Sequence, residues 1–373
     1  MTATGPEGRP ATGPPPAPGP VRKWWLGARP RTLPAALVPV VVGTAAAHAR
    51  HLSTAVVRVL SVPPGGSVAI TTPAGVSVTR VPSASGTTVV LHSHLVTPRV
   101  NAWWCALGAL VVALAIQIGT NYANDYSDGV RGTDDARVGP VRLTATGLAS
   151  PSAVRRAAFL AFGVAAVVGL GLAWATSWWI LLVGAACLLA GWFYTGGPRP
   201  YGYVGLGEVF VFVFFGLVAT VGTFYVQTLH LGVGQVWLAA AMVGLLATAL
   251  LLANNLRDIA TDIESGKRTL AVRVGRRAGG WCYVACVGLP FLGVAVWGLL
   301  AVTGAVAGAW PVLVFAPLAA LPFAVAPARL ALGDVEGRAL LPVLAATGRL
   351  QLVFGALLAF ALWATLPPGA LLG

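Results

Sequence analysis

Charged side chains are scarce in this chain. Asp, Glu, Lys and Arg together make up 9% of the 373 residues, whereas hydrophobic residues make up 57%. A soluble globular domain carries about 25% charged residues, so the composition excludes an ordinary soluble domain. The mean hydropathy of +0.80 and repeated apolar runs of about 20 residues, the length that crosses the bilayer core, indicate an integral membrane protein with several spans.

Cysteine is rare as well, and all its copies fall in apolar runs: Cys105, Cys187, Cys282 and Cys286. No His or carboxylate accompanies them, so we expect small packing residues rather than metal ligands.

The remaining irregular segments give the expected domain plan. Residues 1–22 are rich in Pro and Gly and lack the apolar core of a signal peptide, which predicts a disordered tail that is not cleaved. A transmembrane domain is expected over 23–373. Within it, residues 50–100 contain no acidic residue and show short alternations such as 68–71 and 76–79. This pattern predicts a small β-rich insertion outside the membrane, built on a hairpin.

Apolar runs of near-spanning length predict an all-α, multi-pass membrane protein with nine transmembrane helices. The runs lie at about 33–49, 102–122, 154–174, 178–195, 204–226, 236–256, 281–303, 309–328 and 347–367.

The net charge of +13 does not favour a nucleic-acid partner, because loop Lys and Arg residues orient membrane proteins. With nine spans and a cytoplasmic N-terminus, all of the 24 basic residues are cytoplasmic except Arg50, Arg58, Arg80 and Arg99. All 11 acidic residues fall on the same side. Since acids contribute little to orientation, their one-sidedness predicts a functional cytoplasmic face.

The first acidic motif closes the second predicted span. Its residues Asn121, Asn124, Asp125 and Asp128 are three or four positions apart, so on a helix they are expected to share one face. Asp134 follows after two glycines that suit a tight turn. Carboxylates stacked at a membrane surface repel one another and are costly to ionise unless a cation neutralises them.

The second acidic motif closes the sixth predicted span and repeats this pattern with Asn254, Asp258 and Asp262 at i, i+4 and i+8. A ligand set of oxygen atoms without His or Cys favours Mg²⁺ or a similar hard cation. Two alternatives stay open: solvated helix ends, and a proton or cation pathway. A transport pathway usually has ionisable groups near the bilayer midplane, and the spans here carry few.

Basic residues adjoin both motifs, namely Arg131, Arg137, Arg142, Arg257, Lys267 and Arg268. Acids together with cations suit a metal ion bound to an anion such as a diphosphate, whose leaving charge they stabilise. A diphosphate at the surface of a largely apolar bundle indicates a lipid tail. The expected substrate is a polyprenyl diphosphate.

The two motifs on many spans resemble the UbiA superfamily of intramembrane aromatic prenyltransferases. Further stretches are similar to its branch that prenylates 1,4-dihydroxy-2-naphthoate in menaquinone synthesis: 29–34, 121–128, 137–142 with 146–148, 194–198 with 201 and 205–208, and 257–258 with 266–272. The resemblance covers roughly 25–50 and 101–367. The insertion at 50–100 departs from the family's short loop, and no role is assigned to it.

The resemblance implies a UbiA-type bundle in a cell membrane, with Mg²⁺ as cofactor and the active site on the cytoplasmic side. Its implied metal ligands are Asn124, Asp125, Asp128, Asp134, Asp258 and Asp262, and its catalytic residues are Asp125, Asp128, Asp258 and Asp262. The implied diphosphate contacts are Asn121, Arg137, Arg142, Asn254, Arg257, Lys267 and Arg268. The implied acceptor contacts are Tyr194, Arg199, Tyr201 and Glu208.

The implied reaction is departure of diphosphate, attack of the dihydroxynaphthoate ring on the allylic cation, and loss of CO₂ to give a demethylmenaquinone. Another acceptor (4-hydroxybenzoate, a tetrapyrrole or a sugar phosphate) is an alternative, and a membrane transporter is a further one. Neither the prenyl chain length nor the oligomeric state follows from the sequence.

Overall fold

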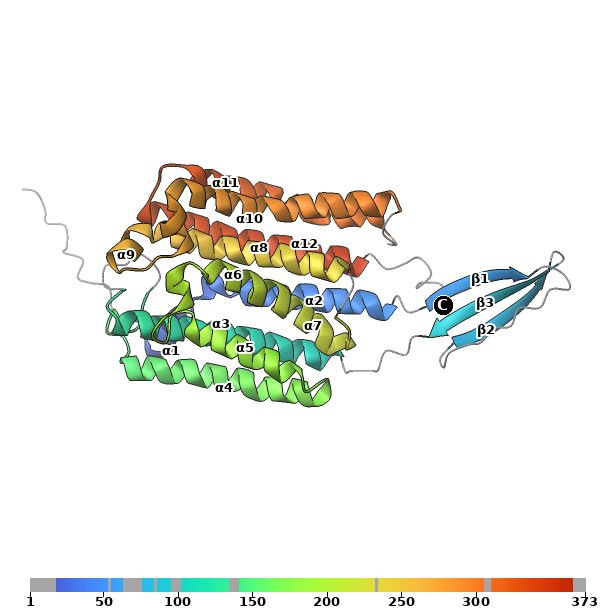
Figure 1. The fold of residues 1–373 in the computed structure, drawn as a ribbon, viewed down its shortest axis with the longest axis horizontal. Coiled ribbons are helices and arrows are strands. Elements are labelled where there is room, and N and C mark those ends of the chain that lie inside the picture. Colours follow the sequence, from blue (N-terminus) through green and yellow to red (C-terminus); the bar gives the residue numbers. More distant parts are fainter. Residues whose placement is uncertain are drawn as a thin grey trace, which may run out of the picture.

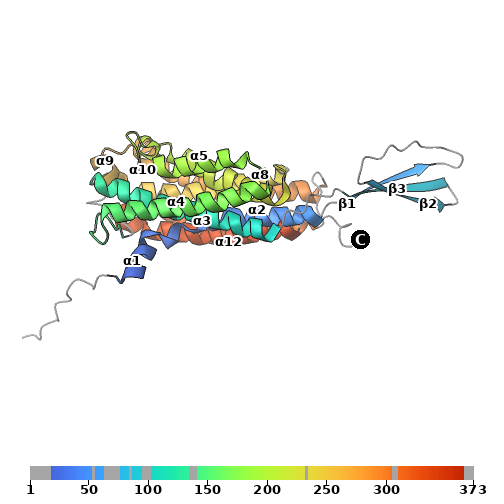
Figure 2. The same ribbon diagram turned by 90° about the horizontal axis from the view of Figure 1, so that it is seen from below.

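In the computed structural model, long helices lie side by side in one bundle, with the short helix α9 at one end and a small sheet beyond the other (Figures 1 and 2). The structure describes residues 18–52, 55–62, 76–83, 86–94, 102–133, 141–231, 234–304 and 310–364.

The first half of the chain contains α1 (Pro20–Gly27), η1 (Pro30–Thr32), α2 (Pro34–Leu52), β1 (Ala55–Val62), β2 (Val76–Ser83), β3 (Gly86–His94), α3 (Ala102–Val130), α4 (Pro151–Ala175) and α5 (Ile180–Phe193). The second half contains η2 (Tyr201–Val204), α6 (Gly207–Val211), the π-helix η3 (Phe212–Val218), α7 (Ala219–Thr228), α8 (Gly234–Arg257), α9 (Ile259–Glu264), α10 (Leu270–Val302), η4 (Pro311–Ala320), α11 (Leu321–Leu332), η5 (Gly337–Leu340) and α12 (Leu341–Ala364).

The prediction of nine spans is corrected by the helix lengths. Within the described residues, seven helices are long and apolar enough to cross a membrane, or eight if the bent pair Pro20–Thr32 and Pro34–His48 forms one span. The run at 178–195 forms a helix of 14 residues, α5. At 1.5 Å per residue it covers only about 21 Å, short of a hydrocarbon core of about 30 Å.

Helix α8 forms the centre of the bundle, and 72% of its apolar window is buried, more than in any other span candidate in the described part of the chain. The π-helix η3 crosses it at two glycines. A Cβ on Gly216 would lie 2.4 Å from the Cα of Gly244, so only glycine at this crossing lets the two backbones approach so closely. The close crossing fixes η3 and α7 against α8.

Strands β1, β2 and β3 form an antiparallel sheet of order β1-β3-β2 between α2 and α3. The alternation at 76–79 lies in β2, whereas that at 68–71 lies outside the described residues. The predicted tail also needs a shorter boundary, because residues 20–22 belong to α1. Residues 1–17 lie outside the described part of the chain.

Candidate functional site

A cavity of about 830 Å³ lies inside the bundle, and both acidic motifs contribute to its wall. Most of the wall is apolar and comes from α2 to α8. Its polar and charged side chains include Arg29, Asn121, Asn124, Asp128, Arg142, Asn254, Asn255, Arg257, Asp262, Lys267 and Thr269. One cavity therefore joins a polar end to a long apolar compartment.

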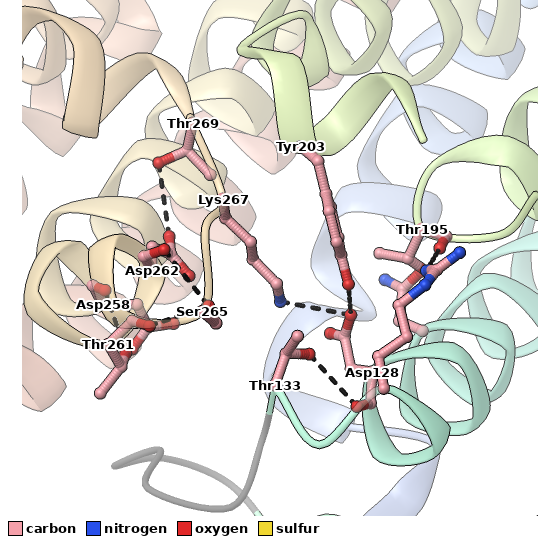
Figure 3. A network of polar contacts seen from close by, with 12 residues as sticks. Asp128, Thr133, Thr195, Tyr203, Asp258, Thr261, Asp262, Ser265, Lys267 and Thr269 are labelled. Carbon is pink, nitrogen blue, oxygen red and sulfur yellow. Dashed lines mark hydrogen bonds and ion pairs between the residues drawn. The ribbon is translucent and has the colours of Figure 1, made fainter. Parts of the chain in front are cut away.

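Asp128 links the two motifs. Its Oδ1 accepts the Tyr203 hydroxyl at 2.6 Å and lies 3.2 Å from the Lys267 ammonium nitrogen. Figure 3 shows Lys267 extending toward Asp128 from the turn that follows α9, the helix that carries Asp262. The side chains of Asp128 and Lys267 are both almost fully buried, so each charge depends on the other for neutralisation.

The turn after α9 positions Lys267 at the cavity wall. The backbone N–H of Lys267 donates to the carbonyl of Asp262 at 2.8 Å, and Gly266 adopts a positive φ of 74°, which glycine tolerates without strain. Thr269 donates its hydroxyl to the Asp262 carboxylate at 3.3 Å. This turn therefore holds Lys267 close to Asp262, and both residues line the cavity.

Tyr203 is surrounded by cations. Its ring centre lies 4.7 Å from the Lys267 nitrogen and 5.4 Å from the Arg131 guanidinium. Burial and the neighbouring Asp128 carboxylate raise the pKa of Tyr203 above its usual range. The phenol therefore stays protonated and keeps donating to Asp128.

Asn121 and Asn124 hold neighbouring segments at the cavity wall. The Asn121 amide donates to the carbonyl of Ala28 at 2.9 Å and to the hydroxyl of Thr32 at 3.1 Å. The Asn124 side-chain oxygen accepts the Thr195 hydroxyl at 2.8 Å. The first motif therefore fixes both the α1–α2 turn and the loop after α5.

Asp125 lies off the cavity wall. Its two carboxylate oxygens accept the backbone N–H groups of Leu143 and Thr144 at 2.7 and 2.9 Å, and its exposed fraction is 0%. This carboxylate holds the loop that carries Arg142, rather than lining the space where a metal ion would bind.

We expect Asp125→Asn to release that loop, because an amide nitrogen would then face a backbone N–H. The loss should lower the free energy of unfolding by about 1–3 kcal/mol and speed tryptic cleavage after Arg142, which is buried in the native protein. Thermal unfolding and limited proteolysis in detergent measure both effects. Asp128→Asn is the matched control, and equal cleavage in the two variants would contradict this role of Asp125.

Three further predicted site residues also lie away from the cavity. Asp258 accepts two hydrogen bonds of 2.7 Å from its neighbour Arg257. Glu208 is buried and accepts the Asn255 amide at 2.8 Å, so it supports a wall residue without reaching an acceptor. Arg268 is exposed. Its backbone N–H donates to the backbone carbonyl of Tyr203.

The predicted acceptor residues divide in the same way. Tyr194 and Tyr201 line the cavity, and the Tyr201 ring stacks on Phe210 with centroids 3.9 Å apart. Arg199, by contrast, is exposed and does not line it. Asp134 and Arg137 lie outside the described residues.

The structure adds site residues that the sequence pattern did not single out. Tyr203, Thr195, Asn255 and Arg29 line the cavity or contact its motif residues. The pair of tyrosines at 201 and 203 was the available signal for Tyr203, and both line the cavity.

The oxygen donors on the cavity wall fit a magnesium ion bound together with a phosphate group. Within the described ranges, no group of three or more His, Cys, Asp or Glu residues could hold a metal ion. The wall offers the carboxylates Asp128 and Asp262 with the amides of Asn124 and Asn254. Mg²⁺ typically uses one or two carboxylates and completes its shell with water and substrate phosphates.

A model of the UbiA prenyltransferase family matches residues 85–338 of the chain. Over 343 residues the chain is 43% identical to a 1,4-dihydroxy-2-naphthoate octaprenyltransferase of Mycobacterium tuberculosis, covering 91% of this chain and 96% of the relative. A protein of the same description from Mycobacterium leprae is 41% identical, with coverage of 94% and 96%. The fold is similar to that of a UbiA homologue from Archaeoglobus fulgidus bound to DMAPP and Mg²⁺, with a TM-score of 0.52, 15% identity and coverage of 92% and 100%.

Proposed function

This chain belongs to the UbiA prenyltransferase family, and from that premise we propose that it transfers a polyprenyl group from a polyprenyl diphosphate to 1,4-dihydroxy-2-naphthoate. The products are a demethylmenaquinol (the reduced form of a demethylmenaquinone), CO₂ and diphosphate. The observation that carries the proposal is the single cavity that joins both acidic motifs to a long apolar compartment. It matches a substrate with an anionic head and a hydrocarbon tail.

The apolar compartment suits the prenyl tail. Its wall includes Gly184 on α5 and Gly222 on α7, with Trp179 and Tyr225 among the lining residues. Trp179 donates its indole N–H to the Tyr225 hydroxyl at 2.8 Å. Because α5 runs from Trp179 back to the polar loop at Tyr194, the tail lies along α5, with this pair at the far end.

The polar end suits the diphosphate. Lys267 and Arg142 line it with Asn124, Asp128 and Asp262, which are the residues proposed to hold Mg²⁺ and the diphosphate. Mg²⁺ bound there supplies neutralisation of the charge that develops on the leaving oxygen. The Lys267 ammonium is the protein's own cation for the same charge, and Tyr203 keeps the partner carboxylate in place.

In the transfer, the C–O bond to diphosphate breaks and diphosphate keeps the electron pair. The naphthoate ring then forms a C–C bond to the allylic cation, and CO₂ leaves with no net proton consumed. Tyr194, Tyr201 and Phe210 lie on the cavity wall, where their rings can stabilise the cation through their π faces. The apolar wall keeps water from capturing it.

We propose that the protein lies in the plasma membrane with the polar end at the cytoplasmic face. The proposal rests on the apolar helices and on the concentration of Lys and Arg at the predicted inner side.

The experiment that tests the function is prenyl transfer by the purified chain, supplied with 1,4-dihydroxy-2-naphthoate and a polyprenyl diphosphate. We expect demethylmenaquinol, detected by mass spectrometry as demethylmenaquinone after oxidation in air, with Mg²⁺ and none with EDTA, because the donor set on the wall needs a cation to bind a diphosphate. Product only with another aromatic acceptor would reject the naphthoate assignment. No product with any acceptor would reject the proposed function.

A further inference from the structure

Arg29 has an unusual backbone. It joins α1 to η1 with φ 55° and ψ 70°, in the left-handed region that side chains disfavour. Among the described residues, Leu229 is the one other non-glycine with positive φ, and it ends helix α7. Arg29 also precedes a proline, and such residues prefer extended backbone. Strain of this kind persists where the surroundings enforce it, and it clusters at binding sites.

The surroundings of Arg29 do enforce this geometry. The Arg29 carbonyl accepts both the backbone N–H and the hydroxyl of Thr32, each at 2.9 Å. Asn121 donates to the carbonyl of Ala28 and to the same Thr32 hydroxyl. The turn is thus fastened to the first acidic motif on α3, and its conformation is set from outside the turn.

Arg29 lines the cavity and contributes a positive charge to its wall. One terminal nitrogen donates to the backbone carbonyl of Asn121 at 3.3 Å. The Nε atom is buried and has no hydrogen-bond partner in the structure. A buried guanidinium N–H without an acceptor is unfavourable, so both the backbone and the side chain of Arg29 carry a cost that a bound anion would offset.

The position at which Arg29 meets α3 indicates which anion it binds. Asn121, the contact of Arg29, precedes Asp128 on α3 by about two turns, or roughly 10 Å along the helix. At the acidic motifs, Lys267 pairs with Asp128 and Arg257 pairs with Asp258. Through its contact with Asn121, Arg29 meets α3 about one turn before Asn124 and two turns before Asp128, farther from the polar end of the helix. An acceptor ring that attacks the prenyl carbon beside the diphosphate occupies this depth.

We propose that Arg29 binds the carboxylate of the aromatic acceptor, an inference that rests on the proposed function. A guanidinium presents a planar fork of N–H donors that matches the two oxygens of a carboxylate. Thr32 and Gln117, which lie beside it on the cavity wall, complete a polar patch for the ring hydroxyl. Arg29 is thereby the residue that selects carboxylated acceptors.

The test compares binding of 1-hydroxy-2-naphthoate with that of 1-naphthol, which lacks the carboxylate, to the full-length protein without Mg²⁺ or prenyl diphosphate. We expect the wild type to prefer the carboxylate by about 10- to 100-fold, as a charged hydrogen bond allows. Arg29→Gln should remove the preference. In turnover, the same variant should raise the KM for the naphthoate while leaving the KM for the prenyl diphosphate within about twofold, because uniform binding of one substrate is lost.

Arg29→Gly separates binding from folding. Glycine adopts φ 55° without strain, so this variant should have a Tm at or above that of the wild type and still lose the preference for the carboxylate. Arg142→Gln is the matched control and should raise the KM for the prenyl diphosphate instead. An unchanged preference in both Arg29 variants would overturn the proposal, as would a rise in the prenyl diphosphate KM alone. Wild-type protein without transfer activity would reject the function itself, whatever Arg29 binds.

Discussion

Replacing Asp128 by asparagine is expected to reduce prenyl transfer by ~100- to 1,000-fold, the loss typical of removing a group that stabilises transition-state charge. Asp128 lies on the cavity wall and contacts both Tyr203 and Lys267, so it connects the first acidic motif to the turn that follows the second. The amide keeps the shape but removes the charge. Lys267 then lacks its buried partner, and the metal–diphosphate site loses a ligand.

The measurement is kcat/KM as a function of Mg²⁺ concentration, with thermal unfolding to confirm a folded protein. Asp334→Asn is the matched control, since Asp334 is exposed between α11 and η5, away from the cavity. The control should keep wild-type activity. An Asp128→Asn enzyme with normal turnover at low Mg²⁺ would exclude Asp128 as a metal ligand.

Helix geometry explains how far the sequence could predict the first motif. At about 100° per residue, Asn121, Asn124 and Asp128 fall within roughly 60° of arc, and these three line the cavity. Asp125 lies about 40° outside this arc, next to Asn121, where it meets the 143–144 loop. Spacing of three and four residues groups all four side chains, but only the packed loop shows which one points away.

The second motif was harder to predict, because its helix does not run straight through. Asp258 lies at a break between α8 and α9 with φ −96° and ψ 5°, so the expected stripe of three side chains is interrupted there. The Asp258 carboxylate forms an ion pair with Arg257, while Lys267 and Asp262 line the cavity. The outcome depends on contacts between segments distant in the sequence, which a motif cannot specify.

Hydrophobic runs predicted the helical, membrane-spanning class but not the role of each run. The run at 178–195 is apolar enough for a span, yet its helix is short and lies on the cavity wall. Hydropathy measures transfer to an apolar environment and does not distinguish lipid from the inside of a cavity. The cavity, and with it Arg29 as a candidate ligand, follows only from the packed structure.

A bulky side chain at Gly222 is expected to shorten the prenyl chain that the enzyme accepts. Gly222 lines the apolar compartment, and a Cβ added there meets nothing within 4 Å. The ring of Gly222→Phe therefore enters the space for the tail without pressing on the backbone. We expect kcat/KM for a long polyprenyl diphosphate to fall by ~100-fold. The added ring occupies the space of the distal tail, so a long tail has to bend away from it in order to bind. Geranyl diphosphate, whose short tail stays near the polar end, should react within about threefold of the wild type.

The comparison needs a variant with the same added volume outside the cavity. Gly288 on α10 also has open space around an added Cβ, but it is exposed and does not line the cavity. Gly288→Phe should therefore leave the preference for chain length unchanged, and product masses from mixed prenyl diphosphates measure that preference directly. If Gly222→Phe also leaves it unchanged, the tail does not lie along α7. Equal loss with short and long substrates would instead mean that the ring disturbs the polar end, because obstruction of the tail alone discriminates by length.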